Sequence, residues 1–442
     1  MTATAIAAEE ISTVDALVKA INEGRPGDTV RIAAGRFELN APLAPKQKMT
    51  IEGAGPGKTI LTAADSWNPG VAGLPDSENP AAYLFSFHKT GGVTISGMTL
   101  TGPKLHGAIY CDGCEDLELF NLRVESFLWS GVRTYRMSGF KVHDNEFVDA
   151  GGKVKHTGGA LYMHYSTDSE FWNNRITKTD GRSNNFFGFK GRKGTRCRFH
   201  HNTVDVNFSL EFPFENDSEV EIDHNAFAGV VSIPKYAGGA VVEEGGSFHI
   251  HHNRITKSYA LEWARNGAEV DHNLFDFSTN DDGGNLISEF GRVVSPGPTD
   301  FHDNLIKNPG RGVFWSKGTY DNFRFYNNHV IACTPTRQDG LFGFPPGTDF
   351  ETIVIRDNII ECAKENPRPL MRNEASYKAV IENNQLVNVS DAESYVNRQT
   401  GAKRGPTEPL KFACGVNGEV LVDGWKATPQ PGSAAGRTAG DE

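Results

Sequence analysis

Three consecutive segments of the chain carry basic, phenolic and imidazole side chains at matching positions. Each segment ends in an asparagine, and the matching positions lie twelve and ten residues before it. The residues between these positions are apolar, which predicts strands whose alternate side chains face a core. Strands stacked in register lie ~4.8 Å apart, so side chains at matching positions could reach the same ligand group. The first position holds Arg133, Tyr162 and Lys190, and the second holds Tyr135, His164 and Arg192.

These residue types suit the β-elimination of a uronic-acid polymer. That reaction needs a cation at the sugar carboxylate, a base near C5 and an acid near the glycosidic oxygen that leaves C4. Arg192, helped by Arg133, suits the carboxylate because guanidinium binds it through two hydrogen bonds. Neighbouring cations lower the pKa of an amine, so we predict that Lys190 and Tyr162 exchange the protons. His164 is the rival base, because an imidazole already titrates near neutrality.

The polar face is expected to continue into the next segments. We predict catalytic roles for Lys190, Tyr162, His164 and Arg192, and substrate-binding roles for Arg133, Tyr135, Glu211, Glu215, Lys235, Tyr236 and Arg265. The chain carries a formal net charge of -11, so a basic cluster within it indicates a seat for an anion. The alternative is a structural network on a solvated sheet face, in which Glu211 and Glu215 balance the nearby cations.

A short pattern recurs along most of the chain and predicts the fold. It is an alternating apolar segment, one or two polar residues, an asparagine and a further apolar residue, as in FKVHDNEF, RFHHNTV and EVDHNLF. The period is about 26 residues, which is too short for a propeller blade and leaves no room for two helices. The sequence therefore predicts an all-β parallel β-helix, a solenoid of about 12 coils in which the asparagines stack as a ladder. The ladder positions are Asn121, Asn145, Asn174, Asn202, Asn225, Asn253, Asn273, Asn304, Asn328, Asn358 and Asn384, with Gly97 in the same place before them.

The ends of the chain differ from the repeats. An amphipathic helix over about 12–23, with Ser12 as its N-cap, is expected to cover the open end of the solenoid. We expect one catalytic β-helix domain over 1–400 and a C-terminal extension over 401–442, whose last part is rich in Pro, Gly, Ala and Ser and is expected to be disordered. The histidines before the ladder asparagines, such as His200 and His201, are interpreted as repeat residues rather than metal ligands.

Two stretches of sequence carry a resemblance to known enzymes. VDALVKAINEGRPGDTVRIAAGRFEL resembles the N-terminal cap of the right-handed β-helix polysaccharide lyases of the chondroitinase-B and alginate-lyase family 6, and repeats over about 90–388 follow the same style. LEFPFENDSEVEIDHNAFAGVVSIPKYAGG is similar to alginate lyases of family 31. The resemblance implies a right-handed fold and an acidic polysaccharide, alginate first, as substrate. Family 31 uses a Tyr and Lys pair, which Tyr162 and Lys190 match.

The same resemblance bears on the cofactor. Family 6 enzymes use a Lys and an Arg with calcium, but their paired glutamates are not found at the matching spacing here. We therefore expect no cofactor and no metal ligand, while Glu211, Glu215 and Asn216 leave calcium as the alternative.

The residues alone leave further functions open. A glycoside hydrolase would need two facing carboxylates, for which Glu211, Glu215, Glu262, Asp281 and Asp282 are candidates. A uronate C5-epimerase and a non-catalytic carbohydrate-binding solenoid are also compatible with this pattern. The acidic balance argues against nucleic acid, and no long apolar run indicates a membrane span.

We expect a monomer that acts on an anionic polysaccharide. The first residues lack the pattern of a signal peptide. The protein would be secreted or periplasmic if such a peptide has been removed, and otherwise cytoplasmic.

Overall fold

The structure is a computed structural model that describes most of the chain. It covers residues 10–69, 79–151, 158–179, 187–211, 218–233, 246–261, 267–278, 299–310, 312–315, 322–333, 340–344, 346–371, 378–392, 412–414, 420–422 and 425–426. The chain divides into two compact units, of which the first runs to Gly191 and the second starts at Arg192. None of the helices within these ranges is long and apolar enough to cross a membrane.

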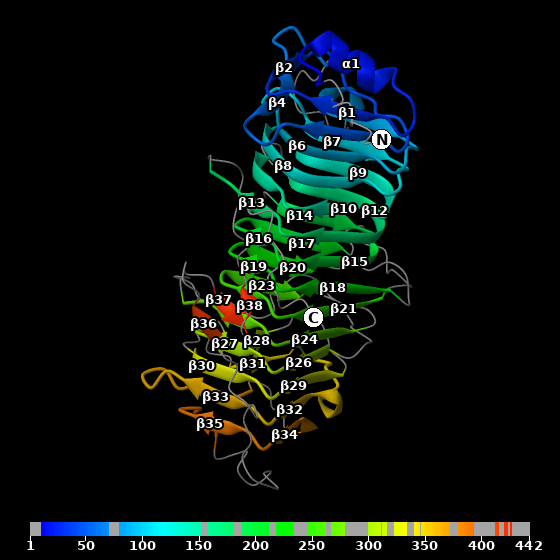
Figure 1. Ribbon diagram of the computed structural model, residues 1–442. Helices are drawn as coiled ribbons and strands as arrows, with labels where there is room; N and C mark the ends of the chain where they lie inside the picture. The colour runs from blue at the N-terminus through cyan, green and yellow to red at the C-terminus, as the bar shows by residue number, and fades with distance from the viewer. Residues whose placement is uncertain are drawn as a thin grey trace, which may run out of the picture. The chain divides into compact units, whose positions relative to one another are not determined.

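The first unit opens with α1 (Val14–Asn22), the only α-helix among the described residues. The helix lies at the end of the strand stack (Figure 1). Its own residues Leu17 and Ile21, one turn apart, are buried. The predicted helix is confirmed, but its predicted N-cap is wrong by one residue. Thr13, not Ser12, has extended backbone angles, and its hydroxyl accepts a hydrogen bond from the backbone N–H of Ala16.

The strands of the first unit stack in parallel and wind around a core (Figure 1). β1, β3, β6, β8, β10 and β12 form a first face, and β2, β4, β6, β8, β11 and β13 form a second. β5, β7, β9, β12 and β14 form a third. A single 3₁₀ turn, η1, spans Pro80–Ala82. The strands are β1 (Thr29–Ile32), β2 (Gly35–Leu39), β3 (Thr50–Gly53), β4 (Thr59–Ala63), β5 (Tyr83–His88), β6 (Thr94–Thr101), β7 (Gly107–Asp112), β8 (Glu118–Phe127), β9 (Ser130–Ser138), β10 (Lys141–His143), β11 (Glu146–Ala150), β12 (Gly159–Trp172), β13 (Arg175–Thr177) and β14 (Phe187–Arg192), the last of which ends with the first residue of the second unit.

The second unit repeats this parallel arrangement with shorter strands. Its first face contains β15 (Thr195–His200), β18 (Glu219–Asp223), β21 (Ser247–His251), β24 (Ala268–Asp271), β26 (Thr299–His302), β29 (Phe323–Tyr326), β32 (Val354–Arg356) and β34 (Val380–Glu382). Its second contains β16 (Thr203–Val204), β19 (Ala226–Phe227), β22 (Arg254–Ile255), β25 (Leu274–Asp276), β27 (Leu305–Lys307), β30 (His329–Cys333), β33 (Ile359–Cys362) and β35 (Gln385–Val387).

Further short strands complete the second unit. β17 (Asn207–Glu211), β20 (Val230–Ile233) and β23 (Ser258–Leu261) pair in parallel, as do β28 (Phe314–Trp315) and β31 (Phe342–Gly343), and η2 spans Phe350–Thr352. In the predicted C-terminal extension, β36 (Phe412–Cys414), β37 (Val420–Val422) and β38 (Trp425–Lys426) form a small antiparallel sheet.

The core of each unit is filled by the inward side chains of alternating strands. In the second unit, the ring of Phe208 lies 5.5 Å from that of Phe199 and 4.9 Å from that of Phe227, and all three side chains are buried. Burying one such side chain is worth roughly 1.5–3 kcal/mol relative to leaving it in water. The alternation that predicted strands thus also determines which face of each strand points inward.

Stacked asparagines fix the turn between the first and second faces. In the second unit each ladder amide donates to the Oδ1 atom of the next, for example from Asn225 to Asn253 at 2.9 Å and from Asn253 to Asn273 at 3.0 Å. In the first unit Asn145 donates to Asn174 at 3.0 Å. The predicted ladder is therefore present in both units.

The first predicted rung of the ladder is wrong. Asn145 lies in register with Leu122. Its Oδ1 atom accepts a hydrogen bond from the N–H of Leu122, and its Nδ2 atom donates one to the carbonyl of Leu119. Asn121 is one residue earlier, exposed and at φ 50°, and Gly97 at φ 69° lies in register with it. The pattern LELFNLRV was aligned one residue out of register, because a turn position that needs positive φ also favours Asn.

That positive-φ position explains the histidines that directly precede the ladder asparagines. His201, His224, His252 and His272 have φ between 51° and 57°, and the same position holds Asp144, Asn173, Asp303, Asn327, Asp357 and Asn383 elsewhere. Asn, Asp and His are the non-glycine residues most enriched in this conformation. The prediction of an all-β parallel β-helix with an N-terminal capping helix is confirmed, with about 11 turns against the 12 or so expected.

Candidate functional site

The first unit brings five of the predicted site residues together. β12 pairs with β9 in parallel, with Tyr162 opposite Arg133 and His164 opposite Tyr135, as counting back from the asparagines predicted. β14 pairs with β12 on the other side and carries Lys190. Three successive coils thus supply the side chains, and the parallel register sets their spacing.

Tyr162 is the centre of this cluster. The guanidinium carbon of Arg133 lies 3.7 Å from the centre of the Tyr162 ring, and the Lys190 ammonium lies 5.4 Å from it. The Nε2 atom of His164 is 3.2 Å from the Tyr162 hydroxyl. A phenol that contacts two cations and an imidazole has both charge stabilisation and a proton-exchange partner.

Tyr135 extends the cluster by one coil. The Arg133 guanidinium donates a hydrogen bond of 2.6 Å to the Tyr135 hydroxyl and lies 5.0 Å from the centre of its ring. The rings of Tyr135 and His164 meet edge to face at 5.1 Å. Arg133 is therefore held between two phenols, which fixes its planar donor group in one orientation.

The central side chains of the cluster are more buried than a solvated sheet face would make them. Arg133, Tyr162 and Lys190 are 6%, 2% and 8% exposed, whereas Tyr135 and His164 are half-buried. Taking two cations out of water costs several kcal/mol each unless other groups compensate. Aromatic ring faces supply part of this compensation, and an anion bound beside the cations would add to it.

Most of the remaining predicted residues lie outside the described residues. Arg192, which is described, ends β14 two residues after Lys190 and is half-buried. Glu211 ends β17, but its side chain lies outside the described residues, as do Glu215, Lys235, Tyr236 and Arg265 entirely. The hydrolase candidates Glu262, Asp281 and Asp282, and the calcium candidate Asn216, also fall outside them.

A second polar face, which the sequence analysis did not single out, lies on β18, β21 and β24 of the second unit. Glu221, His249 and Glu269 stand opposite one another across these strands, and Asp223, His251 and Asp271 form the neighbouring row. His302 on β26 continues the second row. The available sequence signal was His or carboxylate at both two and four residues before successive ladder asparagines.

Hydrogen bonds tie this face together and shift its pKa values. Hydrogen bonding to Asp271 raises the pKa of His249. Burial works against the charge of His302, yet its contacts with Asp303 and Glu269 raise its pKa. For Glu221, the contact with His251 lowers the pKa of the carboxyl group.

Comparison with known proteins supports the fold. A family model described as "Right handed beta helix region" matches residues 88–275. No curated protein sequence matches the chain.

Solved structures with similar folds act on or bind carbohydrates by their own descriptions. The chain is similar to the catalytic unit of a thermostable GH87 alpha-1,3-glucanase from Streptomyces thermodiastaticus, at 17% identity and a TM-score of 0.47, covering 78% of this chain and 68% of that one. It is also similar to a tailspike protein double mutant of E. coli bacteriophage HK620 in complex with a pentasaccharide, at 10% identity and a TM-score of 0.43, covering 78% and 61%.

These similarities are too distant to carry an activity from those proteins to this one. The resemblance to the alginate lyase families stays a prediction. The family model and the parallel strand stack together make the fold a right-handed parallel β-helix, as predicted.

Proposed function

We propose that the protein is a polysaccharide lyase that cleaves an acidic, uronate-containing polysaccharide by β-elimination, with alginate as the first candidate. The observation that carries the proposal is the Tyr162 cluster, in which a buried phenol contacts Arg133, Lys190 and His164. Such a set offers cations for a carboxylate and titratable groups for two proton transfers. The similar structures described as acting on or binding carbohydrates agree with a polysaccharide but favour no reaction type.

Each group of the cluster has a role in the proposed reaction. A base removes the C5 proton, the C5–H electron pair forms the C4–C5 double bond, and the C4–O bond breaks as an acid protonates the leaving oxygen. Tyr162 and Lys190 exchange these protons with the sugar, and His164 can exchange a proton with the Tyr162 hydroxyl across 3.2 Å. The cations beside the Tyr162 ring, Arg133 and Lys190, are placed to offset negative charge that develops during the proton transfers.

Arg133 is proposed to hold the uronate carboxylate. Negative charge grows on that carboxylate as C5 loses its proton, so a permanent cation beside it stabilises the transition state more than the ground state. Tyr135 orients the guanidinium through their 2.6 Å hydrogen bond. Arg192, two residues after Lys190 on β14, is the first residue of the second unit, and its predicted role at the carboxylate stays a prediction.

The proposal predicts the effect of two substitutions on activity. Tyr162→Phe removes only the hydroxyl, and Lys190→Gln removes the ammonium. Each should lower kcat/KM on polymannuronate or mixed alginate by about 10²–10⁴-fold, the range expected for loss of a general acid or base. Turnover is measured from the ultraviolet absorbance of the C4–C5 double bond, with circular dichroism to confirm that each variant is folded.

Tyr165→Phe is the matched control. Tyr165 lies on the same strand, β12, but is 42% exposed, so the identical chemical change should leave activity near the wild-type value. Near-full activity in both cluster variants would refute the assignment of roles. New reducing ends without the absorbance would indicate a hydrolase, and epimerised sugars in uncut chains would indicate a C5-epimerase. Binding without turnover would indicate a carbohydrate-binding protein.

The proposed chemistry needs no metal at the cluster. Calcium would compete with Arg133 and Lys190 for the substrate carboxylate. A calcium-selective chelator should therefore leave the lyase rate unchanged, and loss of activity that calcium restores would contradict this part of the proposal.

We further propose that the enzyme acts as a monomer on this polymer.

A further inference from the structure

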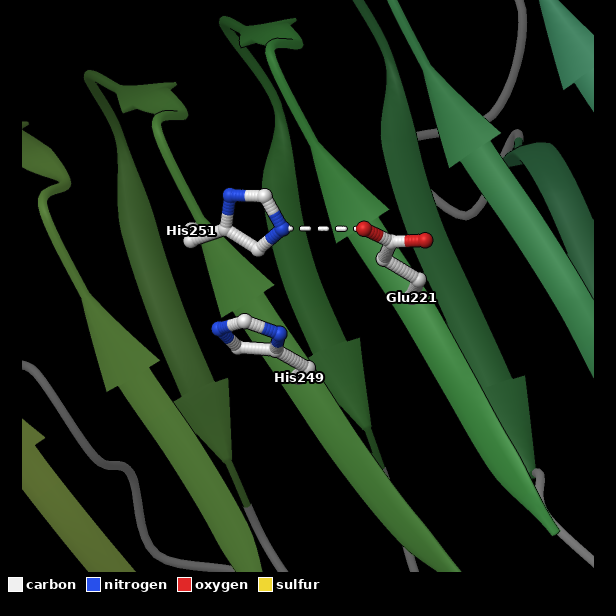
Figure 2. A group of neighbouring side chains, drawn as sticks. All are labelled: Glu221, His249 and His251. Carbon is white, nitrogen blue, oxygen red and sulfur yellow. Dashed lines mark hydrogen bonds and ion pairs between the residues drawn. The ribbon is translucent and has the colours of Figure 1, made fainter.

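We propose that Glu221, His249 and His251 in the second unit form a binding site for a divalent transition metal of the Zn²⁺ class. One ligand atom from each of the three side chains lies within 4.8 Å of the other two. Figure 2 shows the two imidazoles and the carboxylate turned toward one another from neighbouring strands. This site is independent of the Tyr162 cluster and of the proposed lyase activity.

The parallel pairing of β18 with β21 brings these three side chains together. Glu221 lies opposite His249 in the parallel register of β18 and β21, and His251 is two residues along the same strand, so it leaves the same face as His249. The rings of His249 and His251 lie 4.1 Å apart. The Nε2 atom of His251 is 3.1 Å from the Oε1 atom of Glu221, a separation close to that of two ligands on one small ion.

His249 has the nitrogen that a metal would need. Its Nε2 atom is 2.9 Å from the Oδ1 atom of Asp271, so the ring N–H donates there and Nδ1 keeps its lone pair. Among the described residues Nδ1 has no hydrogen-bond partner, and it is on the side of the ring that faces Glu221 and His251 (Figure 2). A histidine ligand whose other nitrogen donates to a carboxylate is the usual arrangement around zinc.

Neighbouring side chains also orient the other two ligands, Glu221 and His251. The Oε2 atom of Glu221 is 3.1 Å from the Nε atom of Arg198, which leaves Oε1 directed at His251. The Nδ1 atom of His251 lies 2.8 Å from that of His252, so its Nε2 atom is left for the ion when Nδ1 carries the proton. Each ligand therefore has a neighbour that fixes its tautomer or its rotamer.

The donor set selects the class of metal. Two imidazoles and one carboxylate suit Zn²⁺ and its neighbours, whereas Ca²⁺ and Mg²⁺ prefer oxygen ligands alone. Tetrahedral zinc, with bonds of about 2.0–2.2 Å, holds its ligand atoms about 3.3–3.5 Å apart, so small side-chain rotations would close the site. The side chains of His249 and Glu221 are 29% and 33% exposed, which leaves a fourth position for water.

A second group on the same face, His249 with Glu269 and Asp271, also has three candidate ligand atoms within this distance. Here Asp271 would have to give up its contact with the His249 ring, and the Oε1 atom of Glu269 already lies 3.1 Å from His302. We therefore assign Asp271 to orienting His249 and place the ion at Glu221, His249 and His251. The two arrangements differ in whether Glu221 or Glu269 is a ligand.

The test measures Zn²⁺ binding to the full-length protein after metal removal, by competition with a chromophoric chelator. The wild type should bind one Zn²⁺ per chain, and Co²⁺ in its place should give visible absorption typical of a tetrahedral site. Glu221→Gln and His251→Gln should each weaken binding by about 100-fold or more, and Asp271→Asn by about 10–100-fold, the range expected when a group that orients a ligand is lost.

Two control variants keep the result interpretable. Glu269→Gln on the adjacent strand and His201→Asn, a turn histidine outside the cluster, should bind Zn²⁺ like the wild type. Circular dichroism and the metal-free Tm show whether each variant is folded. The proposal is overturned if the folded wild type binds no stoichiometric Zn²⁺, or if Glu221→Gln binds normally. It is equally overturned if Glu269→Gln and not Glu221→Gln weakens binding, because the ion would then lie in the other group.

Discussion

At the scale of single residues, one backbone conformation accounts for the four histidines that directly precede a ladder asparagine. His201 is at φ 57° in the turn, and its ring stacks on that of His224 at 5.1 Å. The stack continues through His252 and His272 at 4.8 and 5.0 Å. The sequence analysis interpreted the histidines before the ladder asparagines as repeat residues rather than metal ligands. The positive φ gives a physical reason for those directly before an asparagine. His251, two residues before Asn253, is instead proposed above as a metal ligand.

Burial of His201 makes the stability of the fold depend on pH. Desolvation, together with the charge on His200 and His224, lowers the pKa of His201 from 6.5 to about 3, while Asp223 opposes this and Arg198 adds to it. As the pH falls below about 6.5, the unfolded chain binds a proton at this residue before the folded chain does. Stability from His201 is therefore fully present above that pH and is lost as the pH falls toward about 3.

We predict that His201→Asn flattens this dependence. Asn occupies the same turn position at Asn173, Asn327 and Asn383, so the backbone should accept it. Urea unfolding between about pH 7 and pH 4.5 should show a smaller loss of unfolding free energy in the variant, by up to ~1.4 kcal/mol per pH unit within the window. Parallel curves for variant and wild type would mean that His201 protonates as readily in the folded protein as in the unfolded chain.

At the scale of elements, the asparagine ladder determines the turn geometry. Asn328 illustrates one rung: its amide donates to the carbonyls of Phe301 and Tyr326 and to the side chain of Asn358. Its Oδ1 atom accepts from both the backbone N–H and the amide of Asn304. A single side chain thus satisfies buried polar groups in three coils, which explains why the sequence repeats this residue and varies its neighbours.

Removal of one rung should therefore be costly. Asn328→Ala leaves several of these groups without partners, and we expect a loss of about 2–4 kcal/mol in the free energy of unfolding. Asn40→Ala is the comparison: Asn40 is exposed, bonded to Ser66 at the surface, and should change stability by less than ~0.5 kcal/mol. Equal effects in chemical denaturation would show that the ladder contributes no more than a surface contact.

At the scale of the whole molecule, the repeat predicted the fold because every coil must bury one face of its strands and turn at the same place. An inward apolar face, a positive-φ residue and an asparagine recur in order, so even a chain with variable loops between coils specifies a parallel β-helix. The errors were local: Ser12 for Thr13 at the helix cap, and Asn121 one residue away from the ladder. Both concern single positions where adjacent residues have similar propensities, and only the backbone angles distinguish them.

The sites were less predictable than the fold. Counting back from the asparagines placed Arg133 opposite Tyr162 correctly, because strand alternation transfers register over ten to twelve residues. It did not predict that Tyr162 and the two cations would be buried, which depends on neighbours far along the chain. The Glu221, His249 and His251 group was missed because histidines near the ladder asparagines were interpreted as repeat residues, and each member looks like an ordinary outward residue in its own repeat.

A solenoid contacts itself only through neighbouring coils, so a defect should stay local. In Asn328→Ala, hydrogen exchange should accelerate on β26, β29 and β32, the strands that carry the affected coils, and stay near the wild-type rate on β18 and β21. Mass spectrometry of peptic fragments measures this directly. Uniform acceleration across the second unit would indicate cooperative opening of the whole unit instead.

The ladder of the second unit also has a mechanical consequence. The hydrogen bonds between coils run along the stacking direction, so a pull on the two ends of this unit would load its coils in series. Each coil that detaches must break its strand pairing and its asparagine bonds together. The released lengths of chain would then follow the spacing of the asparagines, which runs from 20 residues between Asn253 and Asn273 to 31 between Asn273 and Asn304. The unit would therefore lengthen in unequal steps, and the spacing of the asparagines in the sequence predicts the length of each step.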